Sequence, residues 1–220
     1  MDFSFLADTP LFKNVSQKDA EKMFICLGAF CKKYQKGNVI YGEGQKTHNI
    51  GLVLSGSVNI ERGDVWGNTD ILGHFGKGQI FAETYAFLPD VPLSVNVTAA
   101  DDTEVMFIDA SKLMTSCRET CECHSAVIKN LLALTAEKNL HLSDKIFYTS
   151  HKTIRGRLMA YLSRQASVNG DMSFTIPFDR QQLADYLGVD RSALSAELSK
   201  MRKDGILTYR KNFFSIKETK

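Results

Sequence analysis

One face of a short predicted helix carries side chains that can read a nucleic-acid groove. Within residues 190–203 this face combines guanidinium groups, hydroxyls and a methyl group: Arg191, Ser192, Ser195, Ala196, Ser199 and Arg202. Such groups contact base edges or phosphate oxygens in the major groove of a DNA duplex. The other basic residues nearby are expected to contact phosphate or to be solvated: Lys200, Lys203, Arg210 and Lys211. The pattern predicts a DNA-binding helix.

Two predicted helices must hold this face in place. Asp179 and Gln182, three residues apart, form a capping-box pattern at the start of the first helix, and Gly188 can end it in a left-handed conformation. Asp190 can cap the second helix, whose inward-facing residues recur at i, i+4 and i+7: Leu194, Leu198 and Met201. This spacing is typical of a helix-turn-helix, although any helical hairpin with glycine in its turn shares part of it.

The sequence around the hairpin indicates a basic winged domain. After Gly205, the runs ILTYR and FFSIK flank Lys211-Asn212 and predict a two-stranded wing, while SFTIPF predicts a strand that ends at Pro177. Residues 151–220 hold 13 Lys and Arg against 7 Asp and Glu, a net charge of +6; residues 1–150 hold 14 against 18, a net charge of −4. A basic C-terminal third is expected in a protein that binds duplex DNA.

The N-terminal part has a different pattern. Residues 32–110 contain short apolar runs separated by glycine or by Asp-Asp-Thr, with Ser55-Gly56-Ser57 as a hairpin turn. This spacing predicts antiparallel strands that close into a roll. We therefore expect an α+β protein with three parts: an effector-sensing β-roll (1–124), a dimerisation helix and hinge (125–150), and a winged helix-turn-helix (151–220).

Composition narrows the class of protein. With 44% hydrophobic and 24% charged residues, the chain is expected to be an ordered globular protein. No apolar run approaches the roughly 20 residues of a membrane span, and the acidic N-terminus lacks the basic start of a signal peptide, so we expect a cytoplasmic location. Five cysteines, an odd number, argue against a disulfide framework.

A long helix is predicted between the two ends of the chain. Ser125–Tyr148 as one helix would be about 35 Å long and would have too little neighbouring protein to bury its apolar stripe. A parallel coiled coil with a second copy is the simplest way to cover it, with Lys138 near the seam. Residues 149–152 break the pattern and are the expected hinge. The predicted dimer contacts are Ile128, Leu131, Leu132, Thr135 and Leu142, with Ile146 on the same stripe.

The order roll, long helix, hinge and winged helix-turn-helix resembles the Crp/Fnr family of bacterial transcription regulators across residues 8–217. The segments LVLSGSV, GQIFAE and DRQQLADYLGVDRSALSAELSKMRKDGIL carry the resemblance, the last most specifically. The resemblance implies homodimers on palindromic operators, a small-molecule signal in the roll that acts through the long helix, and RNA polymerase as a partner.

One departure concerns the effector. The resemblance implies an effector pocket at Phe81, Ala82, Glu83, Tyr85, Leu93 and Ser94. Glu83 stands where cyclic-AMP-binding members hold the ribose, but Leu93 stands where they hold the phosphate with arginine. An unpaired cyclic phosphate beside leucine would be costly, so we do not expect cyclic AMP, and no other cofactor is identified. The aromatic residues favour a more apolar ligand, or are simply core.

A second departure concerns the operator. Many members place an arginine that pairs with guanine where Ala196 stands, and Glu197 occupies a position that is often apolar. Direct readout is then expected to shift to Arg191 and Ser195, or to contact between the Ala196 methyl and a thymine methyl.

The segment CRETCECH, residues 117–124, leaves three interpretations open. On a helix, Cys117, Cys121 and His124 would share one face, which suits packing, a redox-sensing thiol pair at Cys117 and Cys121, or a metal with one more ligand.

Three function classes follow. A DNA-binding regulator explains the charge split, the hairpin and the long helix together, whereas a ligand-binding adaptor without a DNA role explains only the roll. An enzyme built on a small barrel would need a metal-ligand set or an acid–base pair. It is not expected, because the histidines of residues 32–110 are only His48 and His74, without His-x-His spacing.

Overall fold

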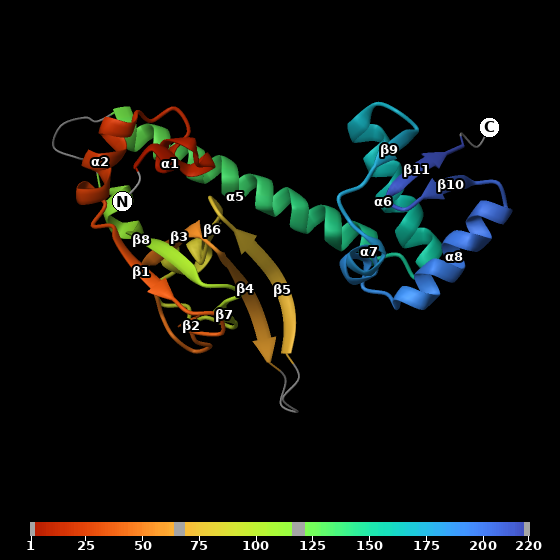
Figure 1. Cartoon of the computed structure of the whole chain (residues 1–220), viewed down its shortest axis with the longest axis horizontal. Helices are drawn as coiled ribbons and strands as arrows, with labels where there is room; N and C mark the ends of the chain where they lie inside the picture. The colour runs from red at the N-terminus through yellow and green to blue at the C-terminus, as the bar shows by residue number, and fades with distance from the viewer. Residues whose placement is uncertain (1–2, 64–68, 116–121, 218–220) are drawn as a thin grey trace. The chain divides into compact units, whose positions relative to one another are not determined.

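The computed structural model describes residues 3–63, 69–115 and 122–217. The chain forms two compact units, Met1–Thr135 and Ala136–Lys220, and the boundary between them falls inside the long helix α5, Glu122–Thr149 (Figure 1). The fold is α+β, as predicted. The domain limits at 124 and 150 remain predictions. In the part of the chain that the structure describes, no helix is long and apolar enough to cross a membrane.

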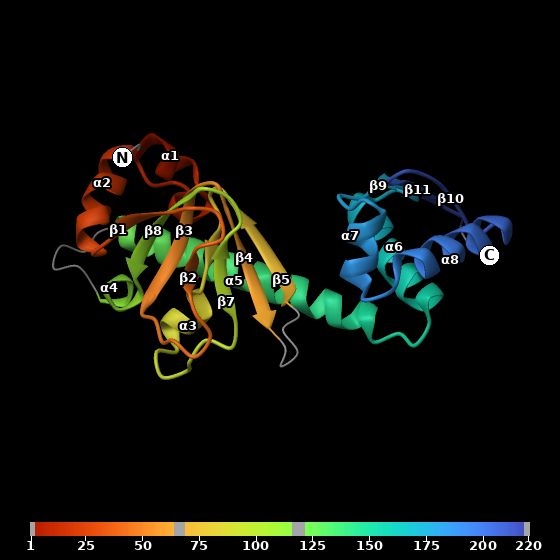
Figure 2. The same cartoon turned by 60° about the horizontal axis from the view of Figure 1, so that its bottom comes forward.

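The first unit contains two four-stranded sheets, with strand orders β1-β8-β3-β6 and β2-β7-β4-β5, in which all neighbouring strands run antiparallel (Figure 2). This confirms the predicted antiparallel roll. The strands are β1 (Phe30–Tyr34), β2 (Val39–Tyr41), β3 (Asn49–Ser55), β4 (Ser57–Gly63), β5 (Thr69–Gly76), β6 (Ile80–Phe81), β7 (Asn96–Ala99) and β8 (Thr103–Asp109).

The hairpin between β3 and β4 turns at Gly56, as the sequence predicts. Gly56 has φ = 74°, and a Cβ atom there would lie 2.4 Å from the backbone oxygen of Asp102. A side chain at this position would therefore meet backbone that cannot move aside, so the turn requires glycine for space as well as for conformation.

Short helices complete the first unit and share a core with β3 and β8. They are α1 (Phe3–Asp8), the 3₁₀ helix η1 (Pro10–Phe12), α2 (Gln17–Cys26), α3 (Glu83–Phe87) and α4 (Ala110–Met114). Leu6, Leu52 and Ile108 belong to one core cluster, together with Val127 and Leu131 from the first half of α5. The start of α5 is thus part of the first unit.

The second unit is a small helical domain with a three-stranded sheet. Its elements are α6 (Ile154–Asn169), β9 (Ser173–Thr175), α7 (Arg180–Leu187), α8 (Arg191–Lys203), β10 (Leu207–Arg210) and β11 (Phe213–Ile216). The wing was predicted with two strands; β9 also pairs with β11, with Phe174 opposite Phe214, because both rings are buried in the same core.

The caps predicted for the hairpin helices are present. Asp179 and Gln182 form a reciprocal capping box on α7, and Gly188 ends the helix with φ = 63°. The residues predicted to point inward from α8, namely Leu194, Leu198 and Met201, are fully buried. The predicted hinge, residues 149–152, joins α5 to α6, and the Ser150 backbone N–H donates to the Ile146 oxygen at 2.9 Å.

Candidate nucleic-acid interface

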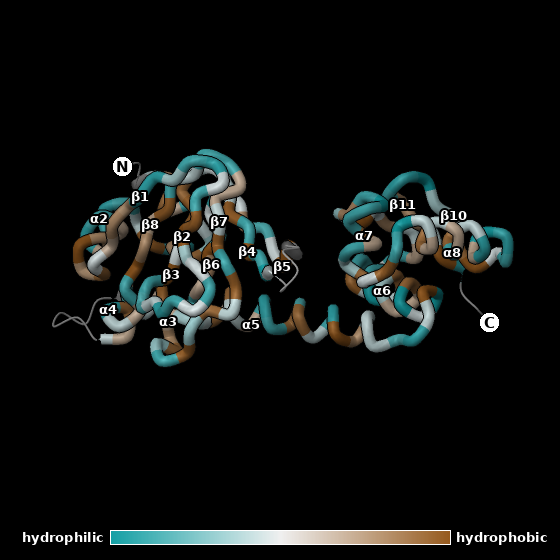
Figure 3. Tube along the Cα trace, turned by 90° about the horizontal axis from the view of Figure 1, so that it is seen from below, coloured by the Kyte–Doolittle hydropathy of each residue, from teal (hydrophilic) through white to brown (hydrophobic). Residues whose placement is uncertain are grey.

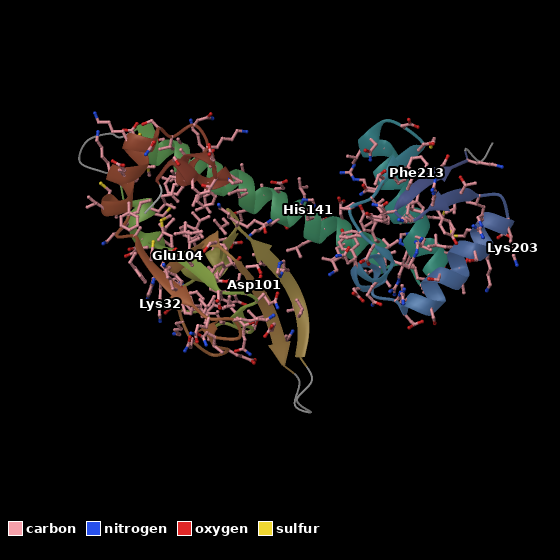
Figure 4. All side chains as sticks on the ribbon, viewed as in Figure 1. Lys32, Asp101, Glu104, His141, Lys203 and Phe213 are labelled. Carbon is pink, nitrogen blue, oxygen red and sulfur yellow. The ribbon has the colours of Figure 1, made fainter. Side chains whose placement is uncertain are left out.

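The predicted reading face of α8 is open to solvent. Arg191, Ser192 and Ala196 are exposed along the first two turns, while Ser195 is half-buried. Lys200, Arg202 and Lys203 are exposed in the last turn, and the Lys203 side chain extends from the end of the helix (Figure 4). The face thus places short polar groups and one guanidinium first and cations last, the order in which a helix inserted by its N-terminal half meets bases and then phosphates.

The first turn of α8 is held by Asp190. Its carboxylate accepts the Ala193 backbone N–H at 2.8 Å and the Ser192 hydroxyl. The hydrogen bond from Ser192 is the main cause that lowers the pKa of Asp190 below its usual value, with the backbone N–H of Ala193 adding to it. The Ser192 hydroxyl proton is therefore engaged in the cap, and the lone pairs of its oxygen remain to accept from a base.

Ser199 is turned toward the domain. Its hydroxyl donates to the Ser195 backbone oxygen at 3.0 Å and lies 3.4 Å from the Tyr209 hydroxyl. Its place on the reading face remains a prediction, whereas its bonds link α8 to the wing.

Arg180 positions the wing. Its guanidinium lies over the Tyr209 ring at 5.1 Å and the Phe214 ring at 5.7 Å, and it donates to the Lys211 backbone oxygen at 3.2 Å. Burial lowers the pKa of Arg180, and the nearby Tyr209 opposes that shift. Lys211, at the tip, is a left-handed residue with φ = 54°. The exposed cations of the wing turn are thus held by a bond from the first residue of α7.

A hollow of about 620 Å³ lies between the start of α7, the start of α8 and the wing tip. Three of its lining residues are cationic, Arg180, Arg191 and Lys211. The Asp179 carboxylate lines the same hollow and accepts the Gln182 N–H at 2.9 Å, so it offsets part of this positive charge. The hollow is lined by Pro177, Asp179, Arg180, Gln181, Gln182, Arg191, Lys211 and Asn212. This chemistry suits an anionic backbone.

Glu197, the residue noted at an often apolar position, has a structural partner. It accepts Arg155 Nε of α6 at 2.6 Å, and the same guanidinium donates to Asp204 at 2.7 Å. One arginine therefore joins α6 to the middle and the end of α8. Because Glu197 is paired within the domain, it does not bring a free negative charge to the reading face.

The positions of the predicted effector pocket lie mostly in the core of the roll. Phe81 and Leu93 are 1% and 2% exposed and belong to one apolar cluster with Phe107. The Phe81 ring fills the space above Gly51, where a Cβ atom would lie 2.2 Å from it. The Leu93 backbone is bonded at both ends to the Gly44–Gln45 turn. The position predicted to lack a phosphate-binding guanidinium is thus a buried leucine.

The other predicted pocket residues lie in α3 or next to it. Glu83 is buried at 7% exposure, Ala82 is a left-handed residue with φ = 60°, and the hydroxyls of Tyr85 and Ser94 lie 2.9 Å apart. The structure brings these residues together at one end of the roll. Of the described residues, no group of three or more His, Cys, Asp and Glu is arranged to hold a metal ion.

Two known domain families match this chain, one in its N-terminal part and one in its C-terminal part. A cyclic nucleotide-binding domain matches residues 31–120, and a Crp-like helix-turn-helix domain matches residues 156–220. The chain belongs to the Crp/Fnr family. Its members are DNA-binding transcription regulators and are not known as enzymes.

The relatives of this Crp/Fnr chain are distant in sequence. The cyclic AMP receptor protein of Thermus thermophilus is 24% identical and aligns with 90% of this chain and 88% of its own. The transcriptional activator protein FnrL of Cereibacter sphaeroides is 22% identical over 81% and 72% of the two chains. Among solved structures, OCPA-complexed CprK has a TM-score of 0.61 at 16% identity and 89% coverage of both chains, and the c-di-GMP responsive global regulator CLP of Xanthomonas campestris has 0.56 at 19% identity over 90% and 98%. These likenesses show the shared fold.

The residues predicted to form one dimer stripe on α5 lie on two different sides of the helix, one buried and one exposed. Leu131 is 5% exposed in the core of the first unit, so its prediction as a dimer contact is wrong; the apolar contacts of the roll already cover it. Leu132 and Leu142 are 69% and 61% exposed, and Thr135 is also exposed. Ile128 is half-buried beside the core. Leu131 and Leu132 are adjacent in sequence, so they must point in directions about 100° apart on a helix.

The structure describes only some of the residues in the predicted cysteine–histidine cluster. Cys117 and Cys121 lie outside the described residues. Cys123 is half-buried against the core of the first unit, and His124 is buried. The Asp19 carboxylate has a lowered pKa, mainly through the Ser16 hydroxyl, with a smaller contribution from the Cys123 thiol. Redox sensing stays a prediction.

Two positioning residues of the interface were missed from sequence. Arg180 and Arg155 are the arginines that fix the wing and α8. Arg180 had a local signal, since it follows the cap Asp179 at the first position of the first helix of the helix-turn-helix. Arg155 had none, because its partners Glu197 and Asp204 lie 42 and 49 residues away.

Proposed function

We propose that this Crp/Fnr chain regulates transcription as a homodimer that binds an operator with two inverted half-sites. The observation that supports this most directly is the hollow shared by Arg180, Arg191 and Lys211, next to the exposed first turns of α8. Each copy then has two adjacent surfaces, one for base edges and one for phosphate. Two copies related by a two-fold axis would read both halves of a palindrome.

The roles of the residues differ along this surface. Arg191 contacts a guanine or a phosphate, with Ser192, Ser195 and Ala196 beside base edges. The remaining basic residues contact the DNA backbone: Lys200, Arg202, Lys203, Arg210 and Lys211. Arg202 also lies over the Tyr209 ring at 5.2 Å, so part of its role is to support the wing.

The signal for this regulator is proposed to differ from cyclic AMP. A cyclic phosphate needs a guanidinium or an equivalent donor set, and Leu93 supplies none while filling the interior with Phe81 and Phe107. RNA polymerase is a proposed partner on the strength of the family alone.

Selection from a random duplex library tests the proposal. We expect one enriched motif with two inverted halves about 10–11 base pairs apart, centre to centre. Titrating that site over a salt series should give a steep slope, and Lys211→Ala should reduce the slope by about one for each phosphate that the lysine neutralises. Lys217→Ala is the matched control, because Lys217 lines a different hollow on the same domain. An enriched motif without two-fold symmetry would contradict the dimeric arrangement.

A further inference from the structure

One stripe of α5 follows a heptad rule. Six residues are separated alternately by four and three positions: Ile128, Leu132, Thr135, Asn139, Leu142 and Ile146. With Leu132, Asn139 and Ile146 at the a positions, the others fall at d. Leu132, Leu142 and Ile146 are 61–69% exposed in one copy. Along α5, hydrophobic stretches alternate with hydrophilic ones (Figure 3). We name these six residues the seam.

The two polar residues of the seam differ in their hydrogen bonds within the chain. Thr135 is polar, but its hydroxyl donates to the Leu131 oxygen at 2.9 Å, so its burial by a partner would strand no donor. Asn139 is exposed and, among the described residues, its amide makes no hydrogen bond within the chain. Its position at a would place that amide between apolar layers in a coiled coil.

A second asparagine on the same helix shows the contrast. Asn130, nine residues earlier, donates its amide to the Leu11 oxygen at 3.0 Å and to the Lys13 oxygen at 2.8 Å. It lies off the seam and fixes α5 to the N-terminal segment of the first unit. One asparagine is therefore used within the chain, and the other presents both a donor and an acceptor outward.

We propose that Asn139 hydrogen-bonds to Asn139 of the second copy, and that this pair selects a parallel, in-register, two-stranded seam. The inference rests on the proposed homodimer and adds what sets its alignment. A two-fold axis beside Asn139 lets each amide donate to the other. A slip of one heptad would instead set Asn139 against Leu132 or Ile146 and leave both amides unpaired in an apolar layer.

An antiparallel arrangement is disfavoured by both hydrogen bonding and charge. Antiparallel pairing would set Asn139 opposite Thr135, whose hydroxyl proton is already engaged within its own chain. It would also bring Lys138, at a g position, beside Lys138 of the second copy, where two like charges meet. The parallel arrangement avoids both, because g positions then face e positions, which are Ala136 and Ser143 here.

Cysteine cross-linking tests the alignment in the full chain. Asn139→Cys should form a disulfide with its own copy on mild oxidation, because opposite a positions in a parallel coil lie within disulfide reach. Peptide mass mapping separates this link from links through the native cysteines. Glu137→Cys, at an outward f position, is the control and should link little. If the protein sediments as a dimer but Asn139→Cys gives no 139–139 link, the proposed alignment is wrong.

Replacement of Asn139 tests whether its amide limits the seam to two strands. Asn139→Leu should tighten self-association at least about tenfold and yield species larger than a dimer, as leucine at a no longer restricts strand number. An unchanged dissociation constant with dimers only would overturn the proposal. A wild-type monomer would instead overturn the homodimer itself, so the two failures are distinguishable.

Discussion

The two units differ at their candidate binding sites: the second unit has exposed cations there, and the first unit has apolar core. In the second unit, internal partners hold the reading face: Asp190 caps α8, Arg155 joins α8 to α6, and Arg180 fixes the wing, so that Arg191 and Lys211 stay exposed. In the first unit, the interior between the sheets is filled by Phe81, Leu93 and Phe107. The proposed DNA-binding surface keeps Arg191 and Lys211 exposed, whereas the position of Leu93 in the roll is apolar core.

The two proposed sites differ in the charge that their ligands would require. A surface that binds a polyanion needs exposed cations, and Arg191, Lys203 and Lys211 are exposed. A pocket that binds an anion must hold a buried cation or a set of donors, and the position of Leu93 holds neither.

The largest effect should come from the seam, because the reading surfaces of two copies act together only when they are linked. Leu132→Glu with Leu142→Glu should convert the protein to a monomer of 24.6 kDa and weaken operator binding by roughly 10²-fold or more. Sedimentation equilibrium and DNA titration measure both. Leu140→Glu is the matched control, since Leu140 is 69% exposed but off the seam. A double variant that stays dimeric would place the interface elsewhere.

Arg191→Ala should be next. Removal of this guanidinium should cost about 1–3 kcal/mol of operator binding and, if Arg191 reads a base, relax the preference at one position per half-site. Competition between the selected site and single-base variants measures both quantities, with Lys217→Ala as the reference. Unchanged affinity and preference would mean that α8 docks differently.

Arg180→Ala should have a smaller effect that depends on Lys211. Without the bond to the Lys211 oxygen and the stacking on Tyr209, the wing tip loses its fixed position. We expect a coupling of about 0.5–1 kcal/mol between Arg180→Ala and Lys211→Ala in operator binding. A double-mutant cycle measures it. Additive effects would show that Arg180 acts on DNA independently of the wing.

Ala82→Gly should raise the stability of the roll by about 0.5 kcal/mol. Ala82 is held in the left-handed region, which costs an L-residue roughly 1–2 kcal/mol, and the greater freedom of glycine in the unfolded chain offsets part of the gain. Urea denaturation measures the change. Ala86→Gly, inside α3, should act in the opposite direction by about 1 kcal/mol. A loss of stability in Ala82→Gly would show that the methyl group contributes more than the strain.

Cyclic AMP should have no effect. Calorimetry at millimolar nucleotide should show no binding, because Leu93 leaves the phosphate unpaired. A dissociation constant below about 100 micromolar would correspond to more than about 5 kcal/mol of binding free energy and would break the contrast between the two units. Leu93→Arg is an informative companion: a gain of nucleotide binding in that variant would show that the missing guanidinium alone had closed the site.

Local chemistry made much of this fold predictable. Capping and turn residues act over a few positions, so Asp179, Gln182, Gly188 and Asp190 determined the two hairpin helices before any tertiary contact was considered. The turn at Gly56 and the alternating runs around it likewise predicted the roll. The reading face of α8 followed from helical spacing, although its contact with DNA remains a prediction.

Contacts between distant residues decided the rest. On one helix, spacing alone groups Leu131 with Leu132 and cannot tell which side the roll covers; only the core contacts of Leu131 separate the buried stripe from the exposed seam. Only the fold brings Arg155 to Glu197 and Arg180 to the wing, and only the fold shows Leu93 as core. Caps, turns and periodicity are local, so the amino-acid pattern alone indicated the elements and their polar faces. Burial depends on residues far apart in the chain, so only the folded protein shows which faces are already covered.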